Sequence, residues 1–152
     1  MSRLESILRI LVFLNGLILL CAAGAVFLPV ATMAHYHELL GLEELPTEPI
    51  VIYLARSTSL LYAVHGAVTL YVACYWQQHH AMVRFLAGLH VVIGLCMIGI
   101  DLSASMPWYW TAFEGAPIAM FGVLLLVLYH KSFGSKAEAS TASTDQAENA
   151  GE

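Results

Sequence analysis

The sequence contains little charge for its length. Of its 152 residues, 11% are charged and only six are Lys or Arg, whereas 59% are hydrophobic. Soluble globular domains carry about 25% charged residues, so this chain lacks the polar side chains that would cover a water-facing surface. Six cations are also too few to neutralise a nucleic-acid backbone. The composition therefore excludes a soluble enzyme domain, a nucleic-acid-binding protein and a disordered protein.

Residue patterns of catalysis and metal binding are missing as well. The sequence has no Gly-x-Ser-x-Gly, phosphate-binding loop, dinucleotide fingerprint or His-Glu-x-x-His motif, and each of these motifs carries a specific chemistry. In the first loop, His35, His37 and Glu38 lack a further firmly placed ligand for a metal ion. Three cysteines lie far apart inside apolar segments, which indicates packing residues and no disulfide; they are Cys21, Cys74 and Cys96. We therefore expect a non-enzymatic protein with no catalytic residue and no metal site.

Four long apolar runs are the main feature that the sequence does have. A bilayer core of about 30 Å needs roughly 20 apolar residues of helix, and each run supplies that length. We predict an all-α, polytopic membrane protein whose residues 1–131 form one antiparallel four-helix bundle. The tail, residues 132–152, is rich in Ser, Ala, Glu and Asp, and we predict that it is disordered and cytoplasmic. The four predicted helices cover about residues 5–30, 50–76, 82–102 and 111–130.

The first helix begins with a capping box, because Glu5 follows Ser2 at the required spacing. Its basic start and the small residues 23–25 also match a cleaved signal peptide, but the apolar run continues to Val30, which favours an uncleaved anchor. A short interfacial helix is expected at about residues 33–40.

The basic residues predict the orientation of the chain. Positively charged side chains accumulate on the cytoplasmic side of membrane proteins, and here the first and third loops have none. We therefore predict that both termini are cytoplasmic and that the protein is a multi-pass protein of a bacterial cytoplasmic (inner) membrane. The residues that carry this prediction are Arg3, Arg9, Arg84, Lys131 and Lys136.

Three charged residues are predicted to lie at the same outer level of the bundle. Arg56 opens the second helix, Asp101 ends the third and Glu114 opens the fourth. Ionisable groups in membrane helices are costly and mark candidate sites, and Arg56 between two carboxylates would leave acceptor capacity for a ligand. With Tyr62, these residues form the predicted ligand-binding cluster. The alternatives are that Arg56 snorkels to the headgroups, that Asp101 caps its helix, and that Glu114 forms a capping box with Thr111.

Two histidines are predicted to lie deeper in the membrane. His65 and His90 lie about 13 and 16 Å from the outer level on adjacent helices, so they could ligate a b-type haem, for which Gly94 would leave room. They could also relay protons toward Asp101. The simplest alternative is that each imidazole packs against a neighbouring helix and hydrogen-bonds a backbone carbonyl or hydroxyl.

Three features of the sequence carry a resemblance: the segment Tyr53-Leu54-Ala55-Arg56, the following residues 60–66 and the short third loop. Together they give a layout that resembles the small bacterial four-helix DoxX-like membrane proteins. The resemblance covers about residues 8–130. It implies an inner-membrane four-helix bundle, and it implies no particular chemistry because many of these proteins have no assigned activity.

The favoured function is a small, non-enzymatic integral membrane protein that acts as an accessory or assembly subunit, or as a binder of a small ligand at the outer cluster. The alternatives are a redox component with bis-histidine haem and an oligomeric transporter of protons or small solutes. Expected partners are the lipid bilayer and either further copies of the chain or a larger membrane complex, with no nucleic acid.

An absorption spectrum separates the favoured function from the redox alternative. We expect protein purified in mild detergent from haem-replete cells to show no visible bands, before or after reduction with dithionite. Sharp α and β bands that disappear in His65→Ala or His90→Ala would contradict this expectation and make the protein a b-type cytochrome.

Overall fold

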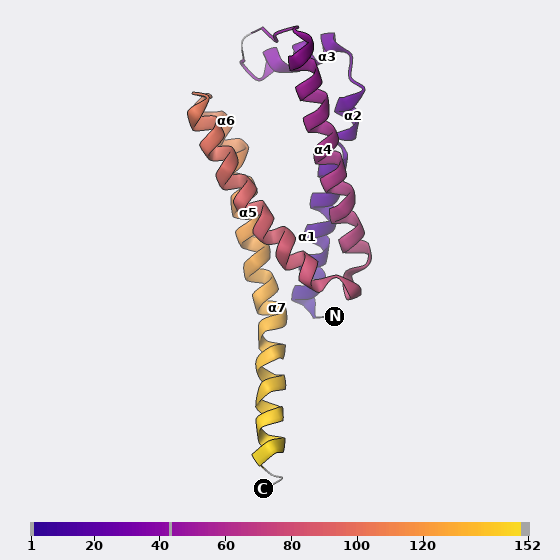
Figure 1. The fold of residues 1–152 in the computed structure, drawn as a ribbon, viewed down its shortest axis with the longest axis vertical. Helices are drawn as coiled ribbons and strands as arrows, with labels where there is room; N and C mark the ends of the chain where they lie inside the picture. Colours follow the sequence, from indigo (N-terminus) through magenta and orange to yellow (C-terminus); the bar gives the residue numbers. More distant parts are fainter. Residues whose placement is uncertain (1, 43, 150–152) are drawn as a thin grey trace. The chain divides into compact units, whose positions relative to one another are not determined.

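The protein is all-helical in the part of the chain that is described. The computed structural model describes residues 2–42 and 44–149, and within the last helix it describes side chains as far as Phe133. No strand occurs in these residues, which confirms the predicted all-α class. The helices are α1 Arg3–Leu20, α2 Ala23–Val26, α3 Val30–Leu39, α4 Pro49–Cys74, the 3₁₀ helix η1 Trp76–Gln78, α5 His80–Ser103, α6 Trp108–Phe113 and α7 Gly115–Asn149 (Figure 1).

Four stretches of helix are long and apolar enough to cross a membrane, which confirms the predicted number of spans. Large apolar side chains point outward along these stretches, and Ile18, Leu102 and Met120 are each 70% exposed or more. Such surfaces are unfavourable in water and suited to lipid. The four candidate spans are Arg3–Val26, Pro49–Cys74, His80–Ser103 and Trp108–Phe133.

Two local predictions are confirmed. The Glu5 carboxylate accepts a hydrogen bond from the backbone N–H of Ser2 at 3.0 Å, and the Ser2 hydroxyl accepts one from the N–H of Glu5 at 3.1 Å. These two bonds form the predicted capping box. The helix expected in the first loop is α3, and its end is closed by Gly41, whose φ of 72° suits glycine.

The chain divides into two compact units, and α1 contributes to both. The α4 unit is Val12–Cys74, and the α5–α7 unit comprises Met1–Leu11 and Tyr75–Glu152. Each unit contains one antiparallel pair of long helices, as the residue contacts below demonstrate. The arrangement of both pairs as one bundle, and the cytoplasmic position of both termini, stay predictions.

In the α4 unit, glycines bring α1 and α4 into backbone contact. A Cβ atom at Gly66 would lie 2.5 Å from the backbone nitrogen of Leu20 and 2.8 Å from the carbonyl oxygen of Gly16. A Cβ atom at Gly16 would lie 2.8 Å from the backbone nitrogen of Leu70. Residue numbers therefore rise along α1 as they fall along α4, which makes the pair antiparallel, and small residues are what such close packing requires.

In the α5–α7 unit, glycines likewise bring the helix backbones into contact. A Cβ atom at Gly94 would lie 2.7 Å from the carbonyl oxygen of Gly115, and one at Gly122 would lie 2.6 Å from the backbone nitrogen of Val91. These contacts again run antiparallel (Figure 1). Apolar side chains complete the core of this unit; they include Trp76, Val83, Leu86, Ala87 and Leu125.

The fourth span differs in detail from its prediction. It consists of α6 and α7 with a break at Glu114, so Thr111 lies inside α6 and the predicted Thr111–Glu114 capping box is wrong. Pro107 immediately precedes α6, which moves the start of the helix ahead of residue 111. The helix α7 continues to Asn149; because side chains beyond Phe133 lie outside those described, the disordered tail stays a prediction.

The glycine contacts predict different costs for two substitutions on α5. Gly94→Leu should destabilise the protein by about 1–3 kcal/mol or more, because its side chain meets the α7 backbone. Gly99→Leu is the matched control, because nothing lies within 4 Å of the corresponding Cβ position. Thermal unfolding in detergent measures both variants, and equal melting temperatures would contradict the close α5–α7 contact.

Candidate functional site

Asp101 is held at the end of α5 by a compact reversal of the chain. The backbone N–H of Met106 donates to the carbonyl of Asp101 at 3.0 Å, and that of Ser105 donates to the carbonyl of Leu102 at 3.3 Å. This is the Schellman pattern, and Ser105 takes the left-handed position with a φ of 55°. A serine is less suited to that position than glycine, so the turn is made despite a local conformational cost.

Glu114 lies at the break between α6 and α7. Its backbone N–H donates to the carbonyl of Trp110 at 2.9 Å, and the Trp110 side chain also hydrogen-bonds the Glu114 carboxylate. Glu114 and Trp110 are both half-buried, so each presents part of its side chain at the surface.

The structure brings Asp101 and Glu114 together within the α5–α7 unit. The two carboxylates lie close enough for the charge of one to act on the other. Asp101 is 3% exposed, and its Oδ2 atom has no hydrogen-bond partner among the described residues. A buried carboxylate of this kind is costly unless positive charge compensates it. The pair therefore forms an acidic site that is suited to a cation, with Trp110 at its edge.

Arg56, the third member of the predicted cluster, belongs to the α4 unit. One terminal nitrogen, Nη2, donates to the backbone carbonyl of Leu28 at 3.2 Å, whereas Nε is buried without a hydrogen-bond partner among the described residues. The side chain is half-buried. The contact with Leu28 was not predicted, and the predicted meeting of Arg56 with both carboxylates stays a prediction.

His90 packs where α5 meets α7. Its Nδ1 lies 2.8 Å from the carbonyl oxygen of Leu86, and its ring meets the edge of Phe121 with centroids 5.6 Å apart. The imidazole is buried in the contact of α5 with α7. The space beside Gly94, which the haem alternative would use, is filled by Ala119 and Gly115 of α7.

The remaining predicted residues lie on α4. His65 and Tyr62 are half-buried there, and the backbone carbonyl of His65 accepts a hydrogen bond from Thr69 at 2.9 Å. His65 and His90 belong to different units, so their joint ligation of haem and their proton-relay role stay predictions.

Within residues 2–42 and 44–149, no three His, Cys, Asp or Glu side chains are grouped so that they could hold a metal ion, and this includes His35, His37 and Glu38. The three cysteines, at positions 21, 74 and 96, are free and exposed.

The chain matches no protein-family model, no curated protein and no solved structure. The resemblance to DoxX-like proteins therefore stays a prediction from the sequence.

Sequence reasoning missed Trp110. The signal for its role was the combination of Pro107, Gly115 and Pro117 around it, which favours a short helix and a break in place of one continuous span. Next to that break, the Trp110 side chain hydrogen-bonds the Glu114 carboxylate.

A double-mutant cycle tests the predicted Arg56 cluster. Arg56→Leu alone also removes the Leu28 hydrogen bond, so it must be compared in the wild type and in Asp101→Asn. If the charges interact, Arg56→Leu should cost at least about 0.5 kcal/mol more in the wild type than in Asp101→Asn. Additive changes in unfolding free energy would leave Arg56 as a snorkelling residue that is tied to Leu28.

Proposed function

We propose that the protein is a small, non-enzymatic integral protein of a bacterial cytoplasmic membrane that binds an organic ammonium group at Glu114, beside the buried Asp101 carboxylate. The observation that supports the proposal is the buried Asp101 carboxylate, whose Oδ2 has no hydrogen-bond partner among the described residues and which faces the charge of Glu114. Two neighbouring carboxylates, one of them buried with an oxygen that no described residue bonds, favour a positively charged ligand.

Each side chain of the site has a distinct role in this proposal. Glu114 is half-buried and accessible, so it forms the direct ion pair with the ammonium group. Trp110 offers an aromatic face beside that carboxylate, and cations bind favourably to tryptophan faces. Asp101 is almost completely buried, so it does not contact the ligand. Its charge makes the electrostatic potential at the ammonium site more negative.

The same chemistry supports the assembly form of this function. A Lys or Arg side chain of a partner subunit carries the same charge as a free ammonium ligand. The exposed apolar faces of the spans would pack against such a subunit or against lipid. In either form the orientation predicted from the basic residues places the site on the outer side of the membrane.

Thermal stabilisation by tetraethylammonium chloride tests the proposal. Because a ligand that binds the folded state stabilises it by mass action, we expect the melting temperature in mild detergent to rise with tetraethylammonium concentration. Glu114→Gln should abolish the rise, Trp110→Leu should reduce it strongly, and Asp101→Asn should reduce it in part.

Two matched controls remove the same types of side chain outside the site. Glu38→Gln removes an exposed carboxylate of α3, and Trp108→Leu removes an exposed indole of α6, so both should keep the full rise. An equal rise with sodium chloride at the same ionic strength, or an undiminished rise in Glu114→Gln, would contradict the proposal.

A further inference from the structure

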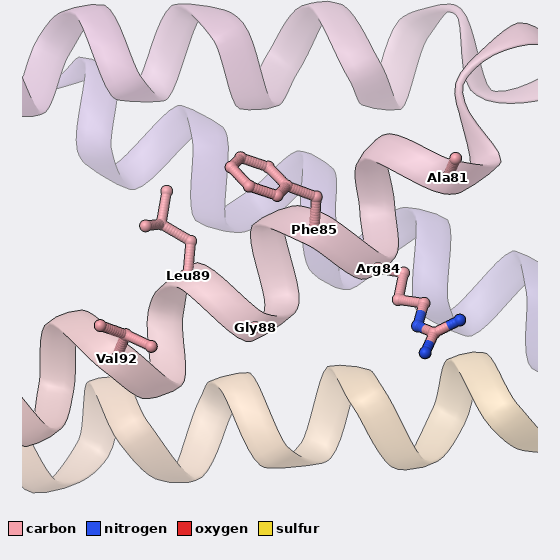
Figure 2. Close-up of a pocket in the computed structure, with 6 residues that line it drawn as sticks. All are labelled: Ala81, Arg84, Phe85, Gly88, Leu89 and Val92. Carbon is pink, nitrogen blue, oxygen red and sulfur yellow. The ribbon is translucent and has the colours of Figure 1, made fainter.

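A second feature of the α5–α7 unit lies near the opposite end of α5 from Asp101. It is a groove of about 500 Å³ along one face of the helix, and every residue that lines it belongs to α5. The spacing of these residues follows the turns of the helix. They are Ala81, Arg84, Phe85, Gly88, Leu89 and Val92 (Figure 2).

The groove exists because its central residue has no side chain. Nothing lies within 4 Å of the position that a Cβ atom at Gly88 would occupy. Phe85 and Leu89 rise on the same side of the helix in Figure 2, and Val92 lies at the opposite end of the groove from Ala81. Gly88 therefore differs from the glycines at the packed contact of α5 with α7, such as Gly94, because no neighbouring backbone requires its small size.

The groove has one charged residue, near the start of the span. Arg84 lies about 6 Å along α5 from its first residue, His80, and its side chain is exposed and points away from the apolar residues in Figure 2. No acidic residue lines the groove. Asp101 and Glu114 lie near the other end of α5, so they do not neutralise this guanidinium.

We propose that this groove binds an anionic phospholipid, with the headgroup phosphate on Arg84 and one acyl chain along Phe85, Gly88 and Val92. From Arg84 to Val92 the helix rises by about 12 Å, which gives a chain a continuous apolar surface below the charge. Arginine forms paired, charge-assisted hydrogen bonds with phosphate oxygens. This site is independent of the ammonium site proposed above.

Charge complementarity favours a lipid over a second copy of the chain as the occupant. A lipid-facing helix packed on the groove would place apolar side chains against Arg84 and leave the guanidinium without an acceptor. An anionic phospholipid has its phosphate at the level where its apolar chains begin, which matches the order of Arg84 and the apolar residues along α5.

Native mass spectrometry of the full chain in mild detergent tests the proposal with two probes of equal acyl chains, dioleoyl phosphatidylglycerol and dioleoyl phosphatidylcholine. The wild type should retain phosphatidylglycerol in preference. Arg84→Gln should reduce phosphatidylglycerol binding about fivefold, the effect of about 1 kcal/mol for one cation at a membrane surface. Gly88→Leu should reduce it at least as much, because leucine fills the groove.

Two control variants separate this site from general effects. Lys131→Gln removes another exposed cation, and Gly99→Leu adds the same side chain at another open position of α5; both should bind phosphatidylglycerol as the wild type does. Equal retention of the two lipids by the wild type would overturn the proposal, as would equal losses in Lys131→Gln and Arg84→Gln. If Gly88→Leu changed the monomer–dimer ratio and left lipid binding intact, the groove would be an interface between copies.

Discussion

The close approach of helix backbones at glycine is the interaction on which the rest of this structure depends. In a bilayer, lipid tails are as apolar as leucine, so helices gain little by burying apolar side chains against each other. Van der Waals contact between closely packed backbones must supply the attraction instead. Gly16 and Gly66 provide it between α1 and α4, and Gly94, Gly115 and Gly122 provide it between α5 and α7.

This packing also determines where the polar groups lie. His90, Gly94 and Asp101 share one face of α5, and the contact at Gly94 turns that face toward α7. His90 therefore packs against Phe121 and bonds the carbonyl of Leu86, whereas Asp101 meets the charge of Glu114. The same α5–α7 contact thus buries one polar group with its hydrogen bond made and brings two carboxylates together.

Much of the fold follows from the sequence because the bilayer allows few solutions. Long apolar runs must be helical there, since every backbone polar group needs an internal partner, and all four predicted spans are present. The Ser2–Glu5 cap was equally predictable, because it is local.

The candidate site was less predictable because it depends on contacts between helices. Asp101 and Glu114 were identified because charged side chains are energetically costly in a membrane. The short connection between their helices was enough to predict that they lie close together. The role of Trp110 depends on the break before Gly115, which a hydropathy pattern does not contain. The Leu28 carbonyl that binds Arg56 lies in irregular chain far away in sequence, and backbone acceptors have no side-chain signature.

The central claim is that all four spans lie in the bilayer as packed helices. Amide hydrogen exchange of the full chain in lipid nanodiscs tests it most directly, because amides that are helical and shielded from water exchange slowly. Four protected blocks that match the candidate spans are expected, separated by faster exchange between α3 and α4, between α4 and α5 and between α5 and α6. Exchange at loop rates throughout any one of the four blocks would contradict it.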